Sequence, residues 1–187
     1  MAASSPIQTE FYESDWTVGY ALKRVQTLER REGAGYVFVA NDGSERSYTF
    51  EEIEVAVINR AKHLLSRGLK KGDRVGIIVP DPEEFVLTFF ACAVAGLVSV
   101  PLFPPLGMGK LDSYIRDTAR ILDIGHAKML ITSKQVEPIL WSLVGKVDEL
   151  DQLITTEKFA GDAPANAPEL DEVHPDDLCF LQFTSGS

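Results

Sequence analysis

The sequence is poor in the residues that form disulfide frameworks and metal sites. It contains two cysteines and three histidines among 187 residues, and Cys92 and Cys179 lie in separate apolar runs. Neither the cysteines nor the histidines have the spacing of a disulfide framework or a zinc site. No Lys or Arg precedes Lys23 and no apolar run follows the N-terminus, so no secretory signal is expected. We therefore expect buried thiols, no metal site and a cytoplasmic location.

Basic residues are scarce relative to acidic ones. Eighteen Lys and Arg stand against 28 Asp and Glu, which gives a net charge of −10. Nucleic acids and anionic membrane surfaces are bound by clustered Lys and Arg, so neither is an expected partner. Ten of the acids but only one base lie in residues 147–177. That acidity indicates solvated surface, with a docking patch for a basic partner as the alternative.

Charged residues are also absent from Phe85 to Gly109, a stretch long enough to cross a bilayer. Its internal pattern favours another interpretation. Asp81 and Pro82 are typical of a helix start, Gly96 of a helix end, and residues 97–101 form a short apolar, β-branched run. We expect a buried helix followed by a buried strand, and no transmembrane segment.

Apolar periodicity divides the chain into alternating helices and strands. Helices are predicted at 18–31, 83–95, 111–124 and 138–144. A further helix is predicted to begin at a capping box formed by Thr49 and Glu52 and to end at Gly68. Strands are predicted at 36–39, 47–49, 74–79, 97–101, 128–132, 152–154 and 178–183. From residue 74 the alternation predicts an α/β fold with a mostly parallel sheet and helices on both faces, preceded by a small N-terminal helix and β-hairpin.

The same pattern divides the chain into four segments. Residues 1–70 hold the N-terminal helix, the hairpin and the next helix, and residues 71–154 hold the βαβ core. Residues 155–177 form an acidic connector rich in Ala and Pro, and residues 178–187 are expected to form a strand and the start of a loop.

That terminal loop is the candidate site. Thr184, Ser185, Gly186 and Ser187 follow an apolar run, and ligands of parallel sheets gather at the carboxyl ends of the strands. Small residues let consecutive N–H groups approach an anion closely. The four residues match neither the P-loop nor the dinucleotide fingerprint. By themselves they also fit an ordinary polar turn.

Their context resembles the adenylate-forming enzymes, a superfamily of acyl-CoA synthetases, fatty acyl-AMP ligases and peptide-synthetase adenylation domains. Residues 180–187 resemble the start of its phosphate-binding signature. Three upstream stretches occur in the superfamily's order: Tyr48-Thr49-Phe50-Glu51-Glu52, Gly72-Asp73-Arg74-Val75 running into Val79-Pro80, and Ala95-Gly96-Leu97-Val98-Ser99-Val100-Pro101-Leu102. Phe103-Pro104-Pro105 and Leu181-Gln182-Phe183 look most like fatty acyl-AMP ligases.

The resemblance implies a function. It implies attack of a fatty-acid carboxylate on the α-phosphate of ATP, with Mg²⁺ balancing charge, followed by transfer of the acyl group to a carrier-protein thiol or CoA. Thr184, Ser185, Gly186 and Ser187 would be part of the ATP phosphate loop, and no catalytic residue is assigned. The family's signature continues beyond these residues. The chain alone is therefore expected to be catalytically incompetent, to need the remainder of the enzyme and to be prone to self-association.

Two alternatives stay open on the residues alone. The chain could be a non-catalytic α/β protein-interaction module that docks through its acidic segment. It could also be an independent, flavodoxin-like nucleotide binder. A continuation of the signature as Thr-Gly-x-Pro-Lys-Gly would separate the ligase from both.

Overall fold

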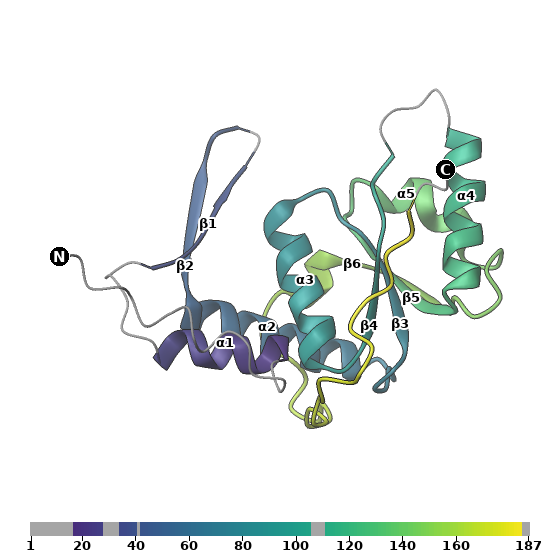
Figure 1. Ribbon diagram of the computed structural model, residues 1–187. Helices are drawn as coiled ribbons and strands as arrows, with labels where there is room; N and C mark the ends of the chain where they lie inside the picture. Colours follow the sequence, from purple (N-terminus) through teal and green to yellow (C-terminus); the bar gives the residue numbers. More distant parts are fainter. Residues whose placement is uncertain (1–16, 28–33, 41, 106–110, 185–187) are drawn as a thin grey trace.

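A parallel β-sheet organises the chain in the computed structural model, which describes residues 17–27, 34–40, 42–105 and 111–184 (Figure 1). The sheet has four strands in the order β4-β3-β5-β6. They are β3 (Arg74–Ile78), β4 (Val98–Pro101), β5 (Ala127–Thr132) and β6 (Gln152–Thr155). A separate antiparallel hairpin of β1 (Gly35–Val39) and β2 (Glu45–Thr49) extends away from this sheet (Figure 1).

Helices cover both faces of the sheet. They are α1 (Val18–Thr27), α2 (Phe50–Leu65), α3 (Pro82–Val94), α4 (Leu111–Ile124) and α5 (Glu137–Leu140), with the 3₁₀ turns η3 (Trp141–Leu143) and η4 (Thr156–Phe159). Successive strand residues point to opposite faces. Val75 and Ile77 of β3 accordingly pack with α2 and α3, whereas Ile78 packs with α4 and α5. The predicted α/β fold, with a mostly parallel sheet between helices, is confirmed.

Local capping explains where two of the helices begin. The N–H of Glu52 donates to Thr49 Oγ1 at 3.2 Å, and the Glu52 carboxylate accepts the N–H of Thr49 at 2.7 Å. This reciprocal pair is the predicted capping box. Asp81 caps α3 in a similar way, because its carboxylate accepts the N–H of Glu84 at 2.9 Å and Pro82 follows as the first helical residue.

Two glycines have structural reasons, one in the backbone conformation and one in side-chain packing. Gly96 has a φ of +66° and ends α3, a conformation that side chains with a Cβ rarely adopt. Gly76 lies in β3 beneath α4, where a Cβ would come within 2.6 Å of Leu122 Cδ2. The missing side chain at position 76 therefore lets α4 pack closely on the sheet.

The structure differs from the predicted strand at 178–183. Only Phe180 pairs there, through an isolated parallel bridge to Ser99 of β4. The next hydrogen bond of a parallel ladder would need a donor at position 101, and Pro101 has no backbone N–H. The terminal segment is therefore held at one point of the sheet edge rather than as a strand.

Smaller differences concern individual residues. The helix predicted at 138–144 divides into α5 and η3, and the end of the helix predicted at 18–31 lies outside the described residues. Cys92 is buried, but Cys179 is only partly buried. Across the described ranges, no helix is both long and apolar enough to span a membrane.

Candidate functional site

Backbone hydrogen bonds to Ser99 hold the segment that leads to the predicted site. The N–H of Ser99 donates to the carbonyl of Cys179 at 3.1 Å, and the N–H of Leu181 donates to the carbonyl of Ser99 at 2.8 Å. Ser99 lies within β4, so the chain from Leu181 continues toward the carboxyl ends of the strands. Thr184 is the one residue of the predicted phosphate loop that is described, since Ser185, Gly186 and Ser187 lie outside the described residues.

A pocket of about 840 Å³ lies beside Thr184. Its walls come from the loops that follow β3 and β4, from one face each of α3 and α4, and from the terminal segment. The lining residues are Val79, Pro80, Pro82, Phe85, Phe89, Pro101, Leu102, Phe103, Pro104, Tyr114, Asp117, Thr118, Ile121, Phe180, Gln182, Phe183 and Thr184. We call this the Thr184 pocket. Its size is within the range of small-molecule sites.

Aromatic contacts connect the walls of the Thr184 pocket. The rings of Phe89 and Phe180 lie 5.7 Å apart at 61°, and those of Phe85 and Phe89 lie 6.1 Å apart at 21°. Edge-to-face and offset stacked pairs at these separations are favourable. They join α3 to the segment that carries Thr184.

Tyr114 connects the opposite wall. Its hydroxyl donates to the backbone carbonyl of Phe103 at 2.9 Å. Burial raises the pKa of the Tyr114 phenol, so the group stays protonated and remains a donor at neutral pH. This hydrogen bond connects α4 to the loop that follows β4.

The electrostatics of the Thr184 pocket suit an apolar ligand. Asp117 is its one charged lining residue, and no Lys or Arg is among the described residues that line it. The Asp117 carboxylate lies 3.9 Å from the Nε of Arg116, its neighbour on α4. An apolar chain fits such walls. Phosphate groups would need hydrogen-bond donors or cations from residues other than those that line this pocket.

The acidic pair Glu83 and Glu84 has structural partners. Glu83 accepts hydrogen bonds from Arg46 at 2.6 Å and from the Tyr48 hydroxyl at 2.7 Å, which ties the hairpin to α3. Burial, followed by the hydrogen bond to Glu83, raises the pKa of Tyr48. The Glu84 carboxylate lies 2.8 Å from Arg60 of α2. Each carboxylate therefore balances a cation on a neighbouring element.

The acidic connector is attached to the domain at several points. Lys71 lies 2.6 Å from the Asp177 carboxylate and donates to the carbonyl of Glu172 at 2.8 Å. Asn59 of α2 donates to the carbonyl of Gly161 at 2.8 Å and accepts the N–H of Ala163 at 2.7 Å. Sequence reasoning missed these contacts, because the partners are about a hundred positions apart.

The histidines lie at separate places. His63 is buried on α2 beside Phe159, and His126 lies 2.6 Å from the Glu149 carboxylate. His174 is exposed and donates its backbone N–H to Asp177. In the described part of the chain, no group of three His, Cys, Asp or Glu side chains could hold a metal ion.

Sequence reasoning placed Thr184 near a ligand site but missed the pocket beside it. Phe85 and Phe89 lie four positions apart on α3, a spacing that predicts a shared helix face. Nothing in that spacing shows that the face meets residues 180–184. The pocket is therefore a product of tertiary packing.

Comparison with known proteins gives concordant matches. Residues 26–187 match the family model described as AMP-binding enzyme. The chain is 32% identical over 144 residues to a feruloyl-CoA synthase of an Amycolatopsis species, covering 74% of this chain and 26% of the relative. It is 28% identical over 165 residues to the medium-chain fatty-acid–CoA ligase of Escherichia coli, covering 78% and 27%.

Solved structures show the same likeness. A structure from a study of fatty acyl-adenylate ligases of E. coli and L. pneumophila superposes with a TM-score of 0.80 at 32% identity, covering 93% of this chain and 31% of that one. The McyG adenylation and carrier-protein structure with phenylalanyl-adenylate shares the fold, with a TM-score of 0.77 at 19% identity over 92% of this chain and 26% of that one. The chain thus spans between a quarter and a third of the length of these relatives.

Proposed function

Because this chain belongs to the AMP-binding enzyme family, we propose that it forms part of an ATP-dependent ligase that activates a fatty acid. In the proposed reaction a fatty-acid carboxylate oxygen attacks the α-phosphorus of ATP, and the bond to pyrophosphate breaks. The products are acyl-AMP and pyrophosphate, and Mg²⁺ accompanies the phosphates. A thiol of a carrier protein or of CoA then takes the acyl group and releases AMP.

One observation carries the proposal: Thr184, the first residue of the proposed phosphate loop, lines a largely apolar pocket. In the proposed arrangement the acyl chain lies along Phe85, Phe89 and Leu102. Its carboxylate is directed toward Thr184, with Ser185, Gly186 and Ser187 continuing the loop that binds the phosphates. The apolar walls favour the hydrocarbon chain through burial of its surface.

The organisation of the chain is part of the proposal. Residues 1–70 and 71–154 would form one wall of the enzyme, residues 155–177 a connector, and residues 178–187 the entry to the phosphate loop. We propose a cytoplasmic setting, which two free cysteines support. The chain alone would not turn over, because the signature of the family extends beyond these residues.

The proposal can be tested by fatty-acid-dependent exchange of pyrophosphate into ATP. The complete open reading frame should catalyse exchange with fatty acids and not with amino acids, and the isolated chain should not. Phe89→Trp should narrow the Thr184 pocket and shift the preference toward shorter acids. Val55→Trp, at an exposed position of α2 outside both cavities, is the matched control. Exchange with amino acids alone would refute fatty-acid activation.

Self-association of the chain is also proposed. Phe103, Phe180 and Phe183 line the Thr184 pocket with 85%, 44% and 37% of their surfaces exposed. Apolar surface of this kind favours contact between copies. Light scattering over a concentration series should show dimers, and Phe103→Ser should weaken them. A constant monomer mass would rule out this association.

A further inference from the structure

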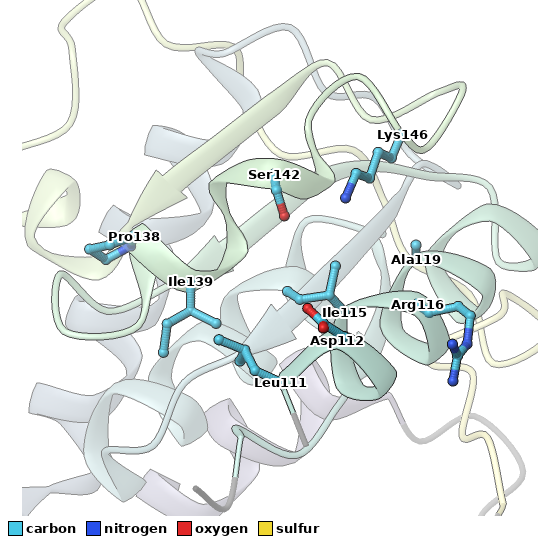
Figure 2. Close-up of a pocket in the computed structure, with 9 residues that line it drawn as sticks. All are labelled: Leu111, Asp112, Ile115, Arg116, Ala119, Pro138, Ile139, Ser142 and Lys146. Atoms are coloured by element: carbon cyan, nitrogen blue, oxygen red, sulfur yellow. The ribbon is translucent and has the colours of Figure 1, made fainter. Parts of the chain in front are cut away.

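A second cavity lies on the other side of α4. It has a volume of about 680 Å³ between α4 and the segment that contains α5 and η3 (Figure 2). The lining residues are Leu111, Asp112, Ile115, Arg116, Ala119, Pro138, Ile139, Ser142 and Lys146. We call this the α4–α5 groove. It shares no residue with the Thr184 pocket.

The helical repeat explains why α4 can border two separate sites. Leu111, Ile115 and Ala119 recur every four residues and face the groove, whereas Tyr114 and Thr118 face the Thr184 pocket. One helix therefore forms a common wall, and each of its two faces presents different chemistry.

The floor of the groove is apolar and continuous with the core. Ile115, Ala119 and Ile139 are partly buried and pack against the hydrophobic cluster beneath α4 and α5. These side chains leave apolar surface open toward the groove, and Leu111 and Pro138 extend it (Figure 2). Such a floor favours a hydrocarbon or aromatic body.

The rim of the groove carries charge. Lys146 and the Ser142 hydroxyl project from the η3 side, and Asp112 lies beside Ile115 on α4 (Figure 2). Lys146 has no ion-pair partner within the described part of the chain, and Arg116 has only its sequence neighbour Asp117 at 3.9 Å. Two cations and one anion thus line a groove in a chain whose net charge is −10.

We propose that the α4–α5 groove is a second ligand site, for a small amphiphile with an apolar body and a carboxylate head group. The body lies on Ile115 and Ile139, and the head group lies between the Lys146 ammonium and the Ser142 hydroxyl. The described lining of the groove offers such a head group a cation, Lys146, and the groove is additional to the proposed acyl site beside Thr184. This inference goes beyond the proposed ligase reaction, because no reacting group is placed here.

The experiment is a titration of the ¹⁵N-labelled chain with decanoate below its micelle-forming concentration. Saturable shifts of the backbone amides at 111–119 and 139–146 are expected. Lys146→Gln should weaken binding about three- to fivefold, as expected for a partly exposed ion pair. Asp112→Asn should tighten it by a similar factor, because it removes a repulsive carboxylate. Lys158→Gln makes the same charge change at an exposed residue of η4, outside the groove, and should have no effect.

The head group is tested separately with 1-decanol and decylammonium. Both should bind more weakly than decanoate. Equal binding of the three probes, or equal effects of Lys146→Gln and Lys158→Gln, would overturn the proposal. Shifts confined to residues 79–85, 101–104 and 180–184 would also overturn it, because they would place decanoate in the Thr184 pocket alone. Shifts in the groove that depend only on protein concentration would overturn it as well, because they would show that a second copy of the chain occupies the groove. None of these readings depends on ligase activity.

Discussion

The backbone N–H of Leu181 donates to the carbonyl oxygen of Ser99 at 2.8 Å. Leu181 lies three residues before Thr184, and Ser99 is completely buried in β4. This hydrogen bond therefore connects the segment that leads to Thr184 to the edge of the sheet. Its partner bond from Ser99 to Cys179 is the other half of the same bridge.

Removing the donor at position 181 tests this connection. Leu181→Pro should lower the free energy of unfolding by about 1–3 kcal/mol, because a buried carbonyl loses its partner. Leu181→Ala keeps the N–H and is the matched control. Urea denaturation gives the stabilities, and the amide shifts of Leu102 and Phe103 report the pocket wall. Equal stabilities of the two variants would show that the bridge contributes little.

Mg-ATP should bind the chain weakly. The lining of the Thr184 pocket offers no described cation, and Asp117 adds a carboxylate. Loop residues that must be ordered cost roughly 1–2 kcal/mol each. Calorimetric titration should therefore give a dissociation constant weaker than about 1 mM. Micromolar binding that is lost in Gly186→Pro would show a loop already organised for phosphate.

Arg60 is expected to matter for stability. It is 8% exposed, donates to Thr88 Oγ1 at 2.8 Å, and lies 5.0 Å above the Phe159 ring. Its ion pair with Glu84 is at 2.8 Å, and the Glu84 side chain is 30% exposed. Arg60→Met should lower the free energy of unfolding by about 2–3 kcal/mol, less than for a fully buried pair.

Exposed Arg120 of α4 provides the matched control for this measurement. Arg120→Met makes the same chemical change and should alter stability by less than about 0.5 kcal/mol. Urea denaturation of both variants gives the comparison. If Arg60→Met is as stable as Arg120→Met, the interactions of Arg60 are redundant.

The two thiols should react at different rates. Burial raises the pKa of Cys92 to about 12, and partial burial also raises the pKa of Cys179. The thiolate is the reactive form, so both react slowly and Cys92 the more slowly. With a disulfide reagent at pH 8, Cys179→Ser should remove the faster phase of the folded chain. An unchanged fast phase in Cys179→Ser would contradict this order.

The attachment of the connector at Asp177 should depend on pH. The backbone N–H of His174, and then Lys71, lower the pKa of the Asp177 carboxyl below its ordinary value. Because the pKa of Asp177 is lowered in the folded chain, its ionised carboxylate stabilises the fold at pH values above the ordinary pKa of about 4. This stabilisation is lost as the pH falls through the lowered pKa.

Asp177→Asn should therefore shift the urea midpoint at pH 7 and have little effect at pH 2. Asp176→Asn, at an exposed neighbouring position, is the control. A destabilisation by Asp177→Asn that is the same at both pH values would show that the charge of Asp177 does not contribute.

Local features of the fold were determined by the sequence itself. The capping box at Thr49 and Glu52, the cap at Asp81 and the end of α3 at Gly96 depend on groups within a few residues, so their chemistry can be read directly. The apolar runs of β3 and β5 likewise indicate strands buried on both faces. From these features the parallel α/β fold could be predicted.

Only the tertiary structure decided what surrounds Thr184. The strand order β4-β3-β5-β6 brings the loops after β3 and β4 together, and Phe89 meets Phe180 across 91 positions of sequence. Pro101 reduced the predicted terminal strand to one bridge, because the ladder needs a donor that lies in another segment. Such contacts depend on how distant elements pack. The periodicity of a single helix or strand shows which face is apolar, but it does not show which element packs against that face.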